Sequence, residues 1–172
     1  MELRMHSHDW HRRMPDWLAA VGAGLVAGAV LMVLELLWST IFSTSIGGGS
    51  PWHTSHQIAA IVLGPQTLAS TAAFDFTVVA VALITHYVLG IVFAIVLAFV
   101  IDGFHYESQP GMLQLIGVVF GAGLYLVNFY GLSYLFPWIA DMRGWATFIG
   151  HLVFGMTAAL TYSALERRRS DR

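Results

Sequence analysis

The chain has 172 residues, of which 57% are hydrophobic and only 10% are charged, with a formal net charge of −2. A soluble domain of this size has too little interior to bury so much apolar surface, and about a quarter of its residues would be charged. The absence of cysteine excludes disulfides, thiolate-bound iron–sulfur clusters and thiol redox catalysis, and the charge balance offers no basic surface for nucleic acid.

Four apolar stretches are long enough to cross a bilayer. They cover residues 17–42, 76–101, 112–136 and 145–165. We therefore expect an all-α polytopic membrane protein, a single domain built as a four-helix bundle within the lipid bilayer. Residues 1–16 form a tail, loops are expected at 43–75, 102–111 and 137–144, and Glu35 is the only acidic residue inside a predicted span.

The arginines predict the orientation. Seven of the eight lie before the first span or after the last, and only Arg143 lies between spans. Because cytoplasmic segments carry an excess of basic residues, both termini are expected in the cytoplasm. Residues 43–75 and 137–144 then face outward.

A short helix is predicted in the first outer loop, over residues 51–63. Ser50 is a suitable N-cap, Pro51 suits the first helical position, and a glycine–proline pair follows the last residue. The segment is too short to span and should lie in the interface or re-enter the membrane. His53 and His56 fall on its first turn. Two water-exposed histidines are the simpler interpretation, and a metal site or the mouth of a pathway is the alternative.

The first two spans and the last two share a pattern of small and polar residues. The matching positions are Gly24, Gly28, Ala29, Leu31 and Glu35 with Gly117, Gly121, Ala122, Leu124 and Asn128, and His86, Gly90 and Ala94 with His151, Gly155 and Ala159. This internal repeat predicts two tandem helical hairpins, related by a pseudo-twofold axis along the membrane normal.

Each span carries one polar side chain at a similar depth below its outer end: Glu35, His86, Asn128 and His151. These residues share helical stripes with small residues, which let helices approach closely, so all four are expected to face the bundle interior in one layer. A charged carboxylate there costs at least several kcal/mol, so Glu35 must be protonated, paired with an imidazolium or bound to a cation.

Such a layer suits several functions. The four side chains could bind a metal ion such as zinc, iron or copper, or His86 and His151 could be the axial ligands of a b-type haem. A proton or small-cation path through Glu35 and a histidine is a further alternative. In the structural alternative the layer only fixes helix packing, and the chain is an accessory subunit of a larger membrane complex or a homo-oligomer. The sequence offers no Ser–His–Asp arrangement and no pair of carboxylates that would indicate an enzyme.

Several motifs outside the polar layer are also distinctive. They are Ser50-Pro51-Trp52, the run from Gln57 to Pro65, the run from Leu126 to Gly131, and Phe136-Pro137-Trp138. Through them the chain resembles a widespread group of uncharacterised bacterial four-helix integral membrane proteins, some of them loosely labelled as symporter-like. The resemblance extends from the first span to the last. It implies a location in the bacterial cytoplasmic membrane and carries no activity with it.

Overall fold

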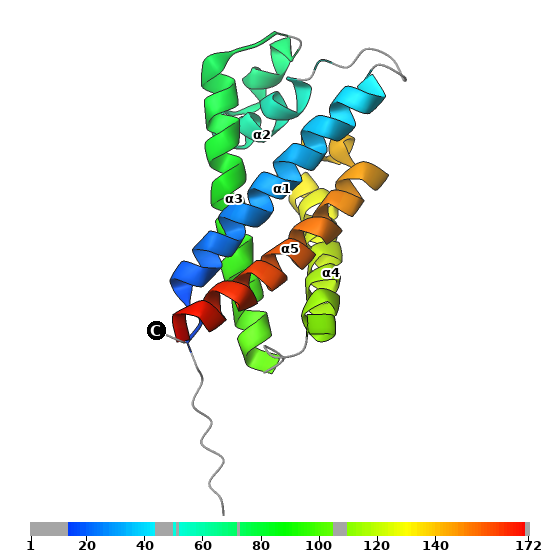
Figure 1. The fold of residues 1–172 in the computed structure, drawn as a ribbon. Coiled ribbons are helices and arrows are strands. Elements are labelled where there is room, and N and C mark those ends of the chain that lie inside the picture. Colours follow the sequence, from blue (N-terminus) through cyan, green and yellow to red (C-terminus); the bar gives the residue numbers. More distant parts are fainter. Residues whose placement is uncertain (1–13, 44–49, 51, 72, 105–109, 171–172) are drawn as a thin grey trace, which may run out of the picture.

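The computed structural model describes residues 14–43, 50, 52–71, 73–104 and 110–170. Its long helices are α1 (Trp17–Ser43), α3 (Phe76–Phe104), α4 (Pro110–Leu126) and α5 (Trp145–Ser170), and a shorter helix, α2 (His53–Leu63), follows α1 (Figure 1). Four short turns of 3₁₀ or π helix complete the described chain: η1 (Pro65–Ser70), η2 (Val127–Gly131), η3 (Leu132–Tyr134) and η4 (Pro137–Met142). No strand occurs in these residues, and the predicted all-α four-helix bundle is confirmed.

Within the described residues, four segments are long and apolar enough to cross a membrane. They are Trp17–Ser39, Phe76–Gly103, Pro110–Tyr134 and Trp145–Arg169. Large apolar side chains stay exposed along all of them, among them Leu37, Ile84, Val119 and Ile149. An exterior of this kind is stable against lipid and not against water, so the chain is a multi-pass membrane protein.

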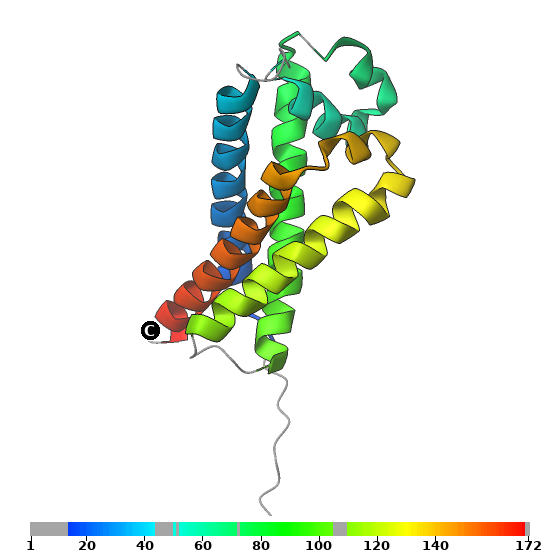
Figure 2. The ribbon, with the colours of Figure 1, turned by 90° about the vertical axis from the view of Figure 1, so that its right-hand side faces the viewer.

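Glycine lets the helices cross in close contact. A Cβ atom added to Gly24 of α1 would lie 2.6 Å from the Cα of Ile91 in α3, and one added to Gly117 of α4 would lie 2.8 Å from the Cα of Met156 in α5. α1 also packs against α5 along its length, so α5 contacts both α1 and α4 (Figures 1 and 2).

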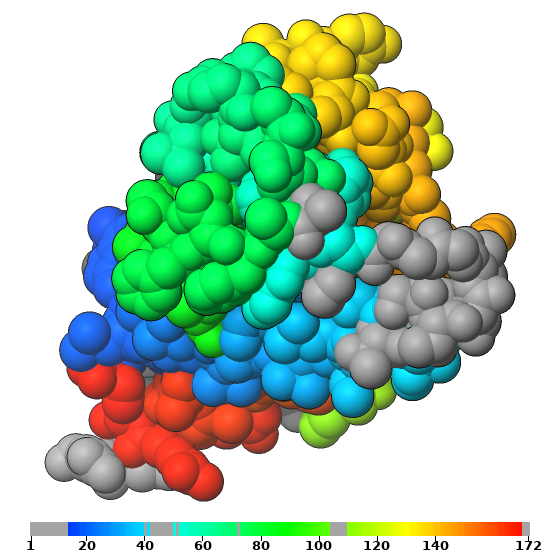
Figure 3. Space-filling model, turned by 90° about the horizontal axis from the view of Figure 1, so that it is seen from above, coloured from blue at the N-terminus to red at the C-terminus, as the bar shows by residue number. Residues whose placement is uncertain are grey.

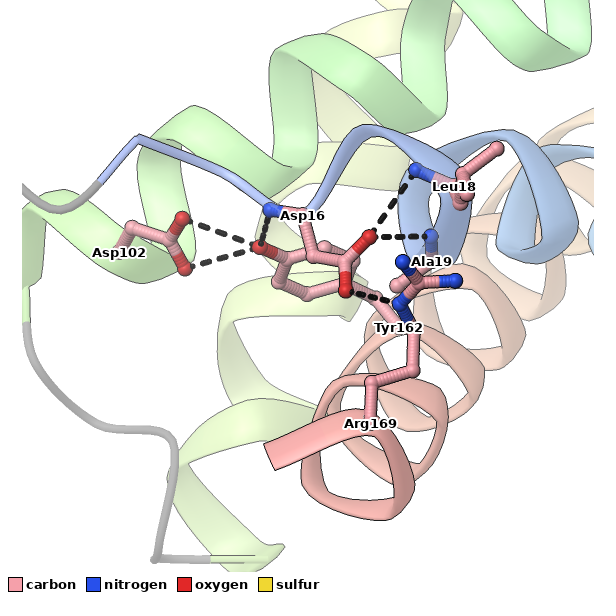
Figure 4. Close-up of polar contacts among 6 residues, drawn as sticks. All are labelled: Asp16, Leu18, Ala19, Asp102, Tyr162 and Arg169. Carbon is pink, nitrogen blue, oxygen red and sulfur yellow. Dashed lines mark hydrogen bonds and ion pairs between the residues drawn. The ribbon is translucent and has the colours of Figure 1, made fainter. Parts of the chain in front are cut away.

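A polar cluster joins three helices at the end of the bundle where α1 begins and α5 ends (Figure 4). The hydroxyl of the buried Tyr162 donates to Asp102 of α3, with oxygen distances of 3.0 and 3.2 Å, and accepts the backbone N–H of Asp16 at 3.2 Å. The Asp16 carboxylate accepts two N–H groups in the first turn of α1 and pairs with Arg169 at 2.6 Å. We call this end of the molecule the terminal end.

The cluster corrects the prediction that Asp102 begins a loop and that Glu35 is the only acid within a span. α3 continues to Phe104, and Asp102 is buried within the last turn of this helix. Its hydrogen bonds with Tyr162 offset the cost of burying a carboxyl group there.

The opposite end of the bundle is covered by short elements. α2 and η1 lie beside η2 to η4, as the view from above shows (Figure 3). The predicted short outer helix is present as α2, and it ends at Gly64, whose positive φ of 92° favours glycine. α2 packs through Ala59 against Val78 and Ala82 of α3.

The third predicted span is not one α-helix. α4 ends at Leu126 and the chain continues as the π turn η2 and the 3₁₀ turn η3, so the span predicted at 112–136 is present as Pro110–Tyr134 but is α-helical only in its first part. A π turn leaves backbone carbonyls without their usual partners. Arg143 donates from Nε to the Phe129 carbonyl at 2.8 Å and from Nη2 to Ser133 Oγ at 3.0 Å, which stabilises this irregular segment.

Candidate functional site

A cavity of about 100 Å³ lies under α2, and all four predicted polar residues line it. Glu35 comes from α1, His86 from α3, Asn128 from η2 and His151 from α5. α2 adds Gln57, which was not among the predicted site residues. The rest of the wall is apolar and includes the rings of Phe93, Phe129 and Phe154. The structure thus brings the four residues together, and their role in binding stays a prediction.

His151 is held by a backbone carbonyl one turn before it. Its Nδ1 donates to the Thr147 carbonyl at 2.8 Å, which assigns the ring proton to Nδ1 and leaves the lone pair on Nε2. Nδ2 of Asn128 lies 3.5 Å from that Nε2, in position to donate a long hydrogen bond. The other side-chain atom of Asn128, Oδ1, is buried and has no partner in the described residues.

His86 is anchored in a similar way but to another helix. Its Nε2 donates to the Gly28 carbonyl of α1 at 2.9 Å, and its Nδ1 has no hydrogen-bond partner among the described residues. This bond is possible because α1 and α3 are further apart here than α4 and α5 are at the equivalent level. A Cβ on Gly28 would be 3.4 Å from the Tyr87 ring, whereas one on Gly121 would collide with the His151 carbonyl.

Glu35 lines the cavity without a partner. Its side chain is half-buried and forms no hydrogen bond or ion pair with any described residue. The two hairpins therefore differ: Asn128 contacts His151 in the second, whereas His86 in the first turns to Gly28 and leaves Glu35 free to interact with a ligand.

Acceptor atoms at this cavity are left without a partner: Asn128 Oδ1, His86 Nδ1 and a carboxyl oxygen of Glu35. A buried polar atom left without a partner costs about 1–3 kcal/mol. A guest that supplies hydrogen-bond donors or positive charge would recover this free energy.

The arrangement fits some guests better than others. No three His, Asp or Glu side chains in the described residues converge as a group that could hold a metal ion, so direct coordination requires a side chain such as Glu35 to move. A b-type haem stays a prediction, and the cavity of about 100 Å³ would have to widen to admit it. The Nε2 of His86 is also already engaged with Gly28.

Two reciprocal hydrogen bonds connect α2, which covers the cavity, to η4. Trp138 Nε1 donates to the Gln57 carbonyl at 3.0 Å, and Gln57 Nε2 donates to the Trp138 carbonyl at 3.4 Å. The buried Gln57 thereby joins α2 to η4, which lie one above the other in Figure 2. No local pattern sets Gln57 apart, because it ends the polar run His-Thr-Ser-His-Gln with which α2 begins.

The secondary candidates His53 and His56 do not line the cavity. His53 is exposed as expected, but His56 is buried, so the interpretation of two water-exposed histidines is wrong for His56. Burial lowers the pKa of His56, the nearby His53 lowers it further, and Asp75 partly opposes both effects. Its Nδ1 lies 3.4 Å from the Trp52 carbonyl.

The cavity is closed toward the terminal end. Phe154 forms part of its wall and belongs to a buried apolar core with Ala94, Leu97 and Ala158. Along α5 this core separates His151 from Tyr162 by 11 residues, or about 16 Å of helix. In this conformation the described residues therefore form a pocket rather than a polar path across the bundle.

No family model matches the chain, and neither the curated proteins nor the solved structures contain a significant match to it.

Proposed function

We propose that this chain is a membrane-embedded binding protein, and that the cavity under α2 takes up a ligand that brings hydrogen-bond donors or positive charge. The observation that carries the proposal is Asn128 Oδ1, a buried acceptor without a partner in the described residues, on the wall that it shares with the unpartnered Glu35. Ligand pockets generally combine apolar walls with a few convergent polar groups, as this cavity does.

A transition-metal ion is a second candidate, favoured by the two histidines. Each imidazole uses one nitrogen to donate to a backbone carbonyl, Gly28 for His86 and Thr147 for His151. Metal-binding histidines are commonly oriented by such a bond, which leaves the other nitrogen available. With Glu35 and Asn128 as oxygen donors, this set suits zinc, iron or copper.

We further propose that the protein lies in the bacterial cytoplasmic membrane with both termini in the cytoplasm. The ion pair between Asp16 and Arg169 supports a common side for the two described ends of the chain, and seven of the eight arginines lie near or beyond these ends. The positive-inside rule makes that side cytoplasmic. The cavity then lies in the outer half of the membrane.

The two hairpins are proposed to be structural repeats around this site. Support comes from the matched contacts: Gly24 meets Ile91 across α1 and α3, and Gly117 meets Met156 across α4 and α5, at positions that the sequence pattern equates. On this proposal the cavity has two related halves with different polar groups.

The function is tested on protein purified in detergent. We expect thermal unfolding to shift upward with at least one guest from a panel of zinc, iron and copper ions, ammonium compounds and neutral donor molecules. A guest at a hundredfold excess over its Kd adds about 2.7 kcal/mol. Glu35→Gln removes the charge at nearly constant shape and should reduce the upward shift in unfolding temperature for a guest that binds Glu35. Asn128→Leu removes the unpartnered acceptor and should reduce the shift for a guest that donates to Asn128. His53→Ala lies outside the cavity and should retain the shift. If no guest shifts the wild type, and cavity variants change only thermal stability, the layer serves packing alone and the proposal is wrong.

A further inference from the structure

We infer that the ligand is a lipid-soluble molecule with a dihydroxy-aromatic head group, of the hydroquinone type. This inference rests on the proposed binding function and names the chemical class that the same cavity would take.

The positions of the acceptors argue against a single ion as the best guest. His86 is tied to α1 through Gly28, and Asn128 is tied to α5 through His151, so the two are held in different halves of the bundle. Together with Glu35 they line one cavity, yet the described histidines and acids do not converge on one point. A ligand that satisfies them must carry donors at separate places.

The apolar walls of the cavity favour a ligand whose hydrogen-bond donors are joined by an uncharged, apolar part. Side chains from every helix contribute apolar surface to the cavity, including Leu31, Ile58, Phe93, Phe129 and Phe154. Apolar walls cannot replace the water that a hydrated ion loses on their side, whereas an aromatic ring gains about 25 cal/mol for each Å² that it removes from water. Phenylalanine edges and faces also pair favourably with a ring.

The size allows no more than a single ring. The cavity is about 100 Å³ and only partly enclosed. An engineered protein cavity of about 150 Å³ is known to bind benzene, so one six-membered ring would fill this cavity and lie partly at its open side. Anything longer has to project outward. Because exposed apolar residues surround the bundle, a hydrocarbon tail on the ring would lie in lipid.

Two opposed hydroxyl groups would meet the two halves of the site. One donates to Asn128 Oδ1, beside His151, and the other donates to Glu35 or to Nδ1 of His86. Each donor then occupies an acceptor that has no partner among the described residues. A 1,4-dihydroxybenzene ring has a twofold axis that relates its two hydroxyl groups, just as a pseudo-twofold axis is proposed to relate the two hairpins.

The test uses a hydroquinone with a short alkyl tail and the dimethyl ether of the same compound, which keeps the ring but has no donors. Both are titrated under argon into the purified protein in lipid nanodiscs, with calorimetric detection. We expect the diol to bind at least tenfold more tightly than the ether, because each lost hydrogen bond in a buried site costs about tenfold in affinity. Equal affinities of diol and ether would overturn the inference, whatever any variant does.

Two amide-to-leucine variants on neighbouring segments supply the matched control. Asn128→Leu removes the unpartnered acceptor and should weaken the diol about tenfold with little effect on the ether. Gln114→Leu, on the exposed surface of α4 and outside the cavity, should bind both as the wild type does. If the two variants behave alike, Asn128 does not contact the ligand and the inference is wrong.

The outcomes separate this inference from the proposed function. Stabilisation by Zn²⁺ that Glu35→Gln abolishes, without any preference for the diol, would overturn the ligand class and support the binding function. No stabilisation by Zn²⁺, by an ammonium compound or by the diol would contradict both.

Discussion

Asn128 and His151 form the most informative pair in the molecule, because their contact depends on the protonation state of the ring. With a proton on Nδ1 alone, Nε2 of His151 accepts from Asn128 Nδ2, and Oδ1 is left over. If the ring gained a second proton, the amide would have to turn over so that Oδ1 accepts from Nε2. Asn128 can serve either form of the ring.

Glycine substitutions test the close crossing of α4 and α5. Gly121→Ala would place Cβ against the His151 carbonyl, so the helices must separate, and we expect a loss of about 2–4 kcal/mol in the free energy of unfolding. Gly123→Ala, two residues away, meets nothing within 4 Å and should be neutral or slightly stabilising. Reversible unfolding in mixed micelles measures both. Equal effects would mean that the backbones do not touch at Gly121.

His56 makes the stability of α2 dependent on pH. Burial and His53 lower its folded-state pKa below the usual 6.5, so below pH 6.5 the unfolded state binds more protons than the folded state. Stability should thus be constant above that pH and should fall as the pH drops through 6.5 toward the lowered pKa.

Hydrogen exchange of the α2 amides at pH 5 and pH 7.5 measures this effect. We expect faster exchange at pH 5 after correction for the intrinsic rate, and a smaller difference in His56→Gln. A His56→Gln protein with an unchanged pH response would exclude His56 as the origin.

At the scale of elements, the Tyr162 cluster is the main polar connection at the terminal end. Tyr162→Phe removes the hydrogen bonds to Asp102 and from the Asp16 N–H while keeping the ring, and should destabilise the bundle by about 1–3 kcal/mol. Tyr134→Phe is the matched control, since Tyr134 is 89% exposed, and it should change nothing. Thermal unfolding that is equal in the two variants would show that the cluster adds no stability.

The sequence predicts the spans well and the irregular elements poorly, for a physical reason. In lipid an apolar segment of sufficient length has to be helical, because its backbone must satisfy its own hydrogen bonds, so hydropathy alone locates α1, α3 and α5. The π turn η2 departs from the regular α-helix, and its Phe129 carbonyl accepts a hydrogen bond from Arg143, which lies 14 residues further along the chain. Hydropathy carries no information on such a partner.

The same distinction holds for the site. Glu35, His86, Asn128 and His151 could be found because spacing along a helix fixes depth and face. Gln57 and Asp102 were missed because their partners are 81 and 60 residues away, and nothing local indicates the pairing. His86 binds the Gly28 carbonyl and not Glu35 because of the distance between α1 and α3 at this level, and the composition of the two spans does not determine that distance.

For the whole molecule, the orientation is open to a direct test because the chain has no cysteine. We expect His53→Cys, on the exposed start of α2, to react with a membrane-impermeant maleimide added to intact cells. A cysteine placed at Arg169 should react only after the cells are permeabilised. The reverse pattern would place the termini outside and contradict the arginine argument.

The unequal crossings give the molecule unequal mechanical stiffness. α4 and α5 are in backbone contact at two successive glycines, Gly117 and Gly121, whereas α1 and α3 meet through backbone at Gly24 and through side chains at Gly28. Glu35 lies 11 residues beyond Gly24, about 16 Å along the helix, in the part of α1 that follows the side-chain contacts at Gly28. Repacking of side chains can absorb a small change in the angle between α1 and α3 there, whereas the same change between α4 and α5 has to separate two backbones.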